Sequence, residues 1–266
     1  MNRFLKKITI LMIVSLMLVV NFISLPTTAL VKANELPFSN ETLEWLEWFN
    51  SLPYEDQIAI NYRPYELTQY LNQGNELFEE LFELVEVDLP NIEPNELVPS
   101  DPGAGGMVTG GYELSYNPNY WNDSTRIKKA NCYYYAMNAL SNSTSLSTQQ
   151  PGYKAGVTFS LNGSSIISAV KKDIPYLSNP VSIRASSQSE KPGVKEYKVA
   201  LVIDPGKDYH WYRQNSDGTW SHKRGQTNVV KTDASGYIIY NPKTCNRNYG
   251  TYNYSTFVGF YIVKYK

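Results

Sequence analysis

The chain has 266 residues, with two cysteines, two histidines and a formal net charge of −1. A chain of this length can fold as one domain with a large core or as two small domains. The cysteines and histidines never occur at a zinc-like spacing, and the sequence has no glycine-rich phosphate loop, so we expect neither a metal nor a bound cofactor.

The N-terminal segment, residues 1–33, has the pattern of a signal peptide. It has two lysines near its start, continues with a mainly apolar run from Ile8 to Leu25, and ends at a small-residue cleavage pattern, Val31 to Ala33. The alternative is an uncleaved membrane anchor. No later segment is apolar over the length of a membrane span. We therefore expect a protein that is secreted or associated with a cell wall, without membrane contact after cleavage.

Residues 34–89 predict a small helical unit. Asn40 can cap a first helix, and Pro53 and Pro64 suit the starts of a second and a third helix. Residues 77–85 repeat apolar side chains at helical spacing, which predicts a fourth helix. The unit contains no histidine and no cysteine, so few of its residues suit catalysis.

Charge divides the chain into two halves. Residues 34–97 contain fifteen acidic residues and one arginine, whereas residues 112–266 contain nineteen lysines and arginines and nine acidic residues. Opposite charges attract at low salt, so the acidic helical unit is expected to cover the basic half as a pro-segment or lid. Cleavage in the proline- and glycine-rich linker, residues 90–111, would release it. The alternative is two solvated surfaces of different composition.

Residues 112–266 predict an α+β domain in which two helices precede an antiparallel meander. One helix begins at or just before Cys132, and the sequence Ser216-Asp217-Gly218 predicts a hairpin turn between two strands. The expected helices are residues 131–140 and 164–173, and the expected strands are residues 196–204, 209–214, 219–224, 237–241 and 256–265.

Cys132 is the candidate nucleophile. A thiol becomes reactive when its pKa is lowered and a base lies nearby, and the free N–H groups at the start of a helix favour the thiolate. Lys128 and Lys129 add positive charge just upstream. The alternatives are an inert buried thiol and a disulfide to Cys245, because an exported protein can form one.

The candidate base is His210, which starts a strand after a turn, with His222 as the alternative base. Asn241 ends a later strand and is the candidate for orienting the imidazole, since an amide can bond its far nitrogen. Tyr120, Asn122 and Asn131 are near enough in sequence to supply an oxyanion donor beside the backbone N–H of Cys132, and Tyr120 is taken as the candidate. Each has an ordinary alternative, such as a histidine paired to a neighbour or an asparagine that forms a turn with the following proline.

The chain order of these residues resembles that of papain-fold enzymes, most of all the NlpC-like and CHAP-type bacterial cell-wall peptidases and amidases. The stretches NCYYYAMN, DYHWYRQNSDGTWSHKRG and IIYNP also resemble a group of exported bacterial proteins. The resemblance implies a papain-like fold with Cys132, His210 and Asn241 as catalytic residues. The chain departs from the papain pattern because no glutamine lies between Tyr112 and Cys132.

Two functions remain open. The first is an exported cysteine hydrolase that cleaves an amide bond in peptide or peptidoglycan, with a basic domain suited to anionic wall polymers. The second is a non-enzymatic secreted binding or structural protein with a Cys132–Cys245 disulfide, which holds glycan or protein on a tyrosine-lined surface. Nucleic acid is not an expected partner, because the tyrosines are spread over strands and suit core and cleft walls.

Overall fold

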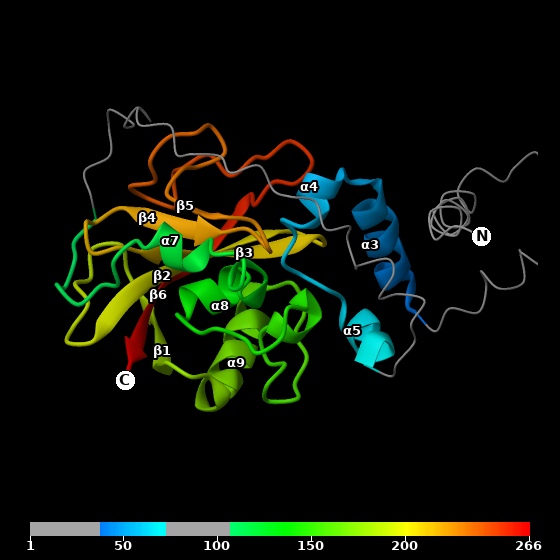
Figure 1. The fold of residues 1–266 in the computed structure, drawn as a ribbon, viewed down its shortest axis with the longest axis horizontal. Helices are drawn as coiled ribbons and strands as arrows, with labels where there is room; N and C mark the ends of the chain where they lie inside the picture. The colour runs from blue at the N-terminus through cyan, green and yellow to red at the C-terminus, as the bar shows by residue number, and fades with distance from the viewer. Residues whose placement is uncertain (1–37, 73–106) are drawn as a thin grey trace, which may run out of the picture. The chain divides into compact units, whose positions relative to one another are not determined.

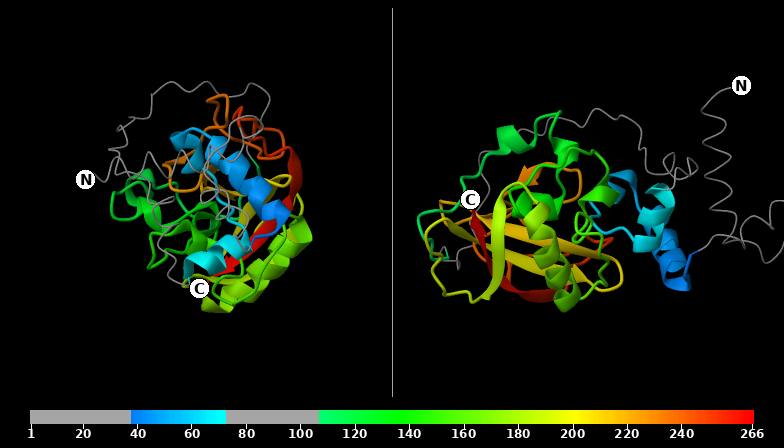
Figure 2. Two further views of the ribbon diagram at one scale, coloured as in Figure 1. Left: turned by 90° about the vertical axis from the view of Figure 1, so that its right-hand side faces the viewer. Right: turned by 90° about the horizontal axis from the view of Figure 1, so that it is seen from below.

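The structure is a computed structural model that describes residues 38–72 and 107–266. The predicted signal peptide, the predicted fourth helix and most of the predicted linker lie outside these ranges. Within the described ranges, no helix has the length and apolar character to cross a bilayer. The described residues from Glu41 onward belong to one compact unit (Figures 1 and 2).

The fold is α+β and is built on an antiparallel sheet with the strand order β1-β6-β2-β3-β4-β5 (Figure 1). The strands are β1 Pro180–Ser186, β2 Glu196–Asp204, β3 Asp208–Gln214, β4 Trp220–Lys223, β5 Val229–Val230 and β6 Thr256–Tyr265. The C-terminal strand β6 lies between β1 and β2. Its long apolar run is therefore an interior strand and not the edge of a simple meander.

The sequence predicted β2 and β6 at their observed bounds, and β3 and β4 to within one residue. The predicted strand at residues 237–241 makes only isolated bridges, through Ile238 and Ile239. Strand β1 was not predicted, because only Pro180 and Ile183 are fully buried along it. An exposed edge strand carries too little apolar periodicity to be detected.

Helices α8 and α9 lie on one face of the sheet (Figures 1 and 2). The helices and 3₁₀ turns of this half are α7 Pro118–Trp121, η2 Ile127–Lys129, α8 Cys132–Ala136, η3 Leu146–Gln149, α9 Gly163–Asp173 and η4 Ile174–Tyr176. Helix α8 is shorter than predicted because Asn138 has a φ of 50°. The N–H of Ala139 then bonds the carbonyl of Tyr134 at 2.8 Å, which is the Schellman pattern that ends helices.

The core between α8, α9 and the sheet is rich in tyrosine. The consecutive residues Tyr133, Tyr134 and Tyr135 are all buried. The Tyr133 hydroxyl bonds the Asp173 carboxylate at 3.0 Å, and the Tyr135 hydroxyl lies 2.7 Å from Ser221 Oγ. Burial of a tyrosine ring stabilises the core, and a hydrogen bond to its hydroxyl avoids the cost of burying an unpaired polar group. Tyr133 and Tyr135 therefore add directional hydrogen bonds to the packing of this core.

The three N-terminal helices are α3 Asn40–Ser51, α4 Tyr54–Gln57 and α5 Tyr65–Asn72, close to three of the predicted helices. They dock against the sheet through buried groups. Trp45 Nε1 donates to the Lys207 carbonyl at 2.8 Å, and the Gln226 N–H donates to the Ile58 carbonyl at 2.8 Å. Directional bonds and aromatic packing therefore join this segment to the sheet, in addition to any long-range charge attraction.

Gly225, in the loop after β4, lies close to the backbone of the N-terminal segment. A Cβ at this position would lie 2.1 Å from the Ile58 carbonyl oxygen, and the φ of Gly225 is +42°. We expect Gly225→Ala to lower the free energy of unfolding by about 3 kcal/mol or more, because backbone strain adds to a clash with another backbone. Urea unfolding measures the loss.

Gly236→Ala is the matched control for this substitution. Gly236 has a φ of +83°, but a Cβ there would meet nothing within 4 Å. The control therefore contains the conformational strain without the clash and should lose only about 1 kcal/mol. Equal losses in the two variants would contradict the close approach at Gly225.

Candidate functional site

A buried polar cluster lies where residues 58–63 cross the start of β3. Its centre is the side chain of Asn61, which is 0% exposed. Asn61 Oδ1 accepts from the Cys132 N–H at 3.2 Å and from the Gly225 N–H at 2.9 Å. Asn61 Nδ2 donates to Asp208 Oδ2 at 3.1 Å and to the Tyr209 carbonyl at 3.2 Å. One amide therefore joins the start of α8, the start of β3 and the loop after β4.

Asp208 is the charged member of the cluster and is also 0% exposed. Strand β4 pairs with residues 212–214 of β3, so the start of β3 is open to other donors. The Asp208 carboxylate accepts from the N–H of Asn61 at 3.0 Å, the N–H of Tyr62 at 2.6 Å and the hydroxyl of Tyr254 at 2.7 Å. Burial raises the pKa of Asp208 to about 6, while these donors oppose the rise.

His210 on β3 and His222 on β4 form a buried, directional pair. His222 Nε2 lies 2.9 Å from the Thr232 carbonyl, and His222 Nδ1 lies 2.7 Å from His210 Nε2. A carbonyl only accepts, so His222 Nε2 carries the proton, and His222 Nδ1 accepts the proton of His210. His210 Nδ1 is then an acceptor, and Asn61 Nδ2 faces it at 3.4 Å. The His210–His222 and His222–Thr232 bonds are both made when the two rings are neutral.

The two imidazoles are held in that neutral state by burial. Burial lowers the pKa of His210 well below its usual range, with the charge of His222 as the second cause. Burial also lowers the pKa of His222 to about 3. Neither ring therefore carries charge near neutral pH.

Cys132 is the first residue of α8 and is 0% exposed. Its sulfur lies 3.9 Å from the Tyr209 carbonyl oxygen. Burial raises the pKa of the Cys132 thiol well above its usual value, and the negative charge of Asp208 raises it further. This direction is the opposite of what the helix-start argument predicts, because loss of hydration outweighs the helix dipole.

Strand alternation places Cys132 and His210 on different faces of β3. Tyr209 and Trp211 belong to the hydrophobic cluster that contains Cys132 and the rest of α8. His210, between them in sequence, stacks instead on Tyr254, with ring centroids 5.1 Å apart. Successive side chains of a strand point to opposite faces. Asn61, beside the start of β3, contacts both Cys132 and His210. The group that faces the His210 imidazole is therefore the Asn61 amide.

The other two predicted site residues have local partners. Asn241 Oδ1 accepts from the Lys243 N–H at 3.0 Å, so it opens a turn. The Tyr120 ring lies 4.5 Å from the Arg126 guanidinium carbon and is 40% exposed. In the described structure, the ring nitrogens of His210 face Asn61 and His222, and Asn241 is not among their partners.

Sequence reasoning missed Asn61 and Asp208, the two residues that organise the cluster. Asn61 follows the apolar residues Ile58, Ala59 and Ile60. A single polar residue in such a run is a signal of a buried hydrogen-bonding side chain. The signal was available, but its partners lie 71 and 147 positions further along the chain.

Both cysteines are free thiols, Cys132 buried and Cys245 partly exposed. The disulfide of the structural alternative is therefore not formed in this structure. The Cys245 thiol faces the Pro242 carbonyl at 3.6 Å in its own loop, whereas the Cys132 sulfur lies in the core beside the Tyr209 carbonyl. Burial raises the pKa of Cys245 to about 12.

We expect two thiols per chain in the unreduced protein after denaturation. In the native protein at pH 7.5, iodoacetamide should label Cys245 slowly and Cys132 only after unfolding, because reaction needs an accessible thiolate. Mapping the labelled sites by mass spectrometry measures both rates. Fewer than two thiols would show that a bridge forms, and fast native labelling of Cys132 would contradict its burial.

Lys223 completes the group of buried ionisable side chains. Its Nζ donates to the Gly225 carbonyl at 3.0 Å, and burial lowers its pKa to about 7. Among the residues that the structure describes, no three histidines, cysteines or carboxylates are placed to hold a metal ion.

The chain is similar to insoluble matrix shell protein 1 of the mollusc Ruditapes philippinarum. The two are 36% identical over 145 residues, which cover 54% of this chain and 86% of the relative. The chain belongs to the family of insoluble matrix shell protein 1. No family model and no solved structure matches the chain.

Membership of the insoluble matrix shell protein 1 family overturns the interpretation as a papain-fold, NlpC-like or CHAP-type bacterial cell-wall peptidase. The chain order of Cys132 and His210 that suggested it has a packing explanation in this family member. Cys132 is a small residue at a crowded helix start, and His210 joins two strands through neutral hydrogen bonds. Chain order does not distinguish such a core from an active site.

Proposed function

We propose that the chain is a non-enzymatic exported protein that acts as a structural or binding component of an extracellular matrix. The observation that carries the proposal is membership of a family whose named member is an insoluble shell matrix protein. An extracellular location agrees with the signal-peptide pattern of residues 1–33.

The closed polar cluster supports a structural role. The Cys132 N–H, which a thiol hydrolase would direct at an oxyanion, is bonded by the chain's own Asn61 side chain. The Cys132 thiol and both imidazoles are 0% exposed. Buried polar networks whose members are mostly paired rigidify a core, so this cluster suits a stable scaffold.

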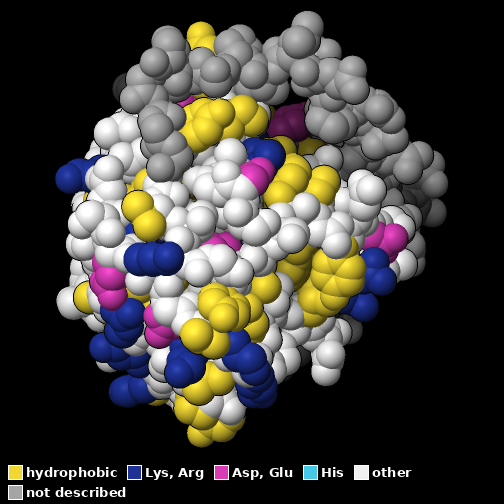
Figure 3. Space-filling model, turned by 90° about the vertical axis from the view of Figure 1, so that its left-hand side faces the viewer, with side chains coloured by type: hydrophobic (Ala, Val, Ile, Leu, Met, Phe, Trp, Pro, Cys, Tyr) yellow, Lys and Arg dark blue, Asp and Glu magenta, His cyan; other side chains and the backbone are white. Residues whose placement is uncertain are grey.

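Acidic polymers are the proposed partner of the basic surface. Lys and Arg side chains gather on the face in Figure 3, where neither histidine is visible. Exposed basic residues of β1, of the loop between β1 and β2, of β6 and just after β6 are Arg184, Lys191, Lys195, Lys264 and Lys266. Arg184 is paired with Glu190 and Glu196, so the other four carry the unpaired charge of this list. Attraction through such exposed charges weakens as salt screens it.

A single comparison tests the proposal. The full chain and its Cys132→Ala variant are passed over polyaspartate beads, and each is incubated with peptide and peptidoglycan substrates. Both proteins should be retained at low salt and released between 0.1 and 1 M salt, roughly the range over which the screening length falls from 10 to 3 Å. Neither should release amines. Amine release that depends on Cys132 would contradict the non-enzymatic role, and no retention would remove the acidic partner.

A further inference from the structure

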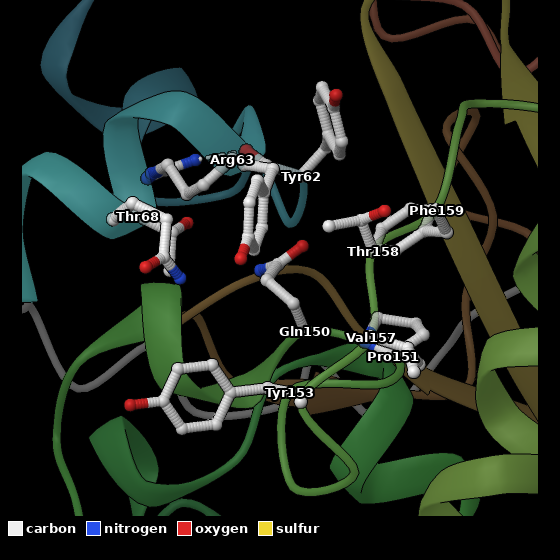
Figure 4. A pocket seen from close by; sticks show the side chains of 12 residues that line it. Tyr62, Arg63, Thr68, Gln150, Pro151, Tyr153, Val157, Thr158 and Phe159 are labelled. Atoms are coloured by element: carbon white, nitrogen blue, oxygen red, sulfur yellow. Dashed lines mark hydrogen bonds between the residues drawn. The ribbon is translucent and has the colours of Figure 1, made fainter.

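A pocket of about 70 Å³ lies between the N-terminal segment and the loop before α9 (Figure 4). The segment from Tyr62 to Gln69 forms one wall, and the loop from Gln150 to Phe159 forms the other. Tyr62 and Phe159 meet edge to face across it, with ring centroids 5.7 Å apart. The pocket adjoins the Asn61 cluster, because the Tyr62 N–H donates to Asp208 while Tyr62 also lines the pocket.

The pocket contains a buried hydrogen-bond acceptor without a partner. Gln150 is 5% exposed, and its Nε2 donates to the carbonyls of Asn61 at 2.6 Å and Leu146 at 2.9 Å. These two carbonyls fix the orientation of the amide. Gln150 Oε1 is then left with no hydrogen-bond partner. Figure 4 shows the amide extending into the space between the two walls. An unpaired buried acceptor favours a ligand that brings a donor.

The pocket continues into an open groove along α9. The two share Val157 and Thr158, and the groove has a volume of about 360 Å³. Its wall is formed mainly by hydroxyl and amide side chains of Asn162, Ser164, Ser165 and Ser168. A pocket of 70 Å³ is far below the roughly 300–1,000 Å³ of a site for a whole ligand. The pair therefore fits one group of a ligand in the pocket and the extended remainder in the groove.

The lining is almost uncharged. Neither wall, over the residues described, contains a carboxylate, and its basic residues are Arg63 and Lys172. The Arg63 guanidinium donates to the Ile60 and Tyr62 carbonyls and lies 4.6 Å from the Phe49 ring centroid, so it is part of the packing. Among the described lining residues, Lys172 is then the exposed cation that a polyanion would meet. A neutral ligand does not need positive charge in order to bind.

We propose that the pocket and groove together bind a linear neutral glycan. A sugar ring has apolar C–H faces that pack on aromatic rings such as Tyr65, which is 46% exposed. Its hydroxyls both donate and accept, as the groove serines do, and one of them supplies the donor that Gln150 Oε1 lacks. The glycan proposal rests on the proposed function, because it takes the chain to be a non-enzymatic binding protein that leaves its ligand intact.

The test is calorimetric titration of the full chain with cellohexaose and with the hexamer of N-acetylglucosamine. The variants are Tyr65→Ala, which removes an aromatic wall, and Thr158→Arg, which places a large side chain where pocket and groove meet. Each should weaken binding at least tenfold. The matched controls are Tyr176→Ala and Ser124→Arg, at exposed positions away from the lining, and they should bind within twofold of wild type.

The outcomes separate the glycan proposal from the proposed function. Binding of either hexamer that both test variants weaken and both controls retain supports the site, and the preferred hexamer tells whether acetamido groups contribute. No binding at millimolar sugar, or equal binding by all variants, overturns the site and leaves the structural role untouched. Chromatography of the sugars after titration should show intact hexamers, and shortened products would instead overturn the non-enzymatic function.

Discussion

Replacement of Asn61 by alanine should destabilise the protein by about 3–5 kcal/mol, the range expected when a buried polar partner of a charge is removed. The substitution removes the acceptor of the Cys132 and Gly225 N–H groups and one donor to Asp208. All of these groups are buried, so water does not replace the lost bonds. The measurement is the urea midpoint and slope at pH 7.

Asn142→Ala is the matched control for this prediction. Asn142 is exposed, so its replacement should change the free energy of unfolding by less than about 0.5 kcal/mol. A loss below 1 kcal/mol in Asn61→Ala would show that water or a neighbouring group enters the space and that Asn61 does not organise the cluster.

Local sequence patterns were sufficient to predict the helices and strands that bury one continuous apolar stripe or run. Strands β2 and β6 and helix α9 were predicted to within one residue, because each has an apolar pattern bounded by a clear turn or cap. Strand β1 and the weak bridges at Ile238 and Ile239 depend on neighbours in the sheet. Single-segment periodicity does not contain that information.

The candidate site shows a second limit of sequence reasoning. Chain order identified Cys132, His210 and His222 as candidates, and all three are buried in one region. Cys132 and His210 contact Asn61, and His222 contacts His210. Their roles depend on which face of β3 each side chain occupies and on hydration, and neither is visible in the order of residues. Loss of hydration turns a helix-start cysteine into a weak acid and strand histidines into neutral bridging groups.

The same hydration argument predicts how stability depends on pH. The pKa of His222 is lowered to about 3 and that of His210 is lowered well below its usual value. Such groups contribute stability above the unfolded pKa of about 6.5, and that stability is lost as the pH falls. Asp208 acts in the opposite direction. Its pKa is raised to about 6, so its unfavourable contribution above pH 6 disappears as the pH falls toward 4.

Replacing both histidines should therefore remove most of the acid sensitivity. Between pH 6 and 4 each histidine lowers stability by up to about 1.4 kcal/mol per pH unit, since the unfolded chain binds a proton that the native chain does not. The His210→Gln/His222→Gln variant keeps an amide donor and acceptor at each position and retains Asp208. Its stability should stay level or rise on acidification, whereas that of the wild type falls.

The informative quantity is the difference in slope between the two proteins, which should reach about 3 kcal/mol per pH unit. Burial also raises the pKa of Asp173 and Asp204, but these carboxylates are present in both proteins and cancel. Gly225→Ala is the control, because it is destabilised and retains both histidines, so its slope should match that of the wild type. Urea unfolding at half-unit steps gives all three slopes. If the double variant keeps the wild-type slope, then the imidazoles already exchange protons with solvent in the folded protein, and the pair is not sealed within the sheet.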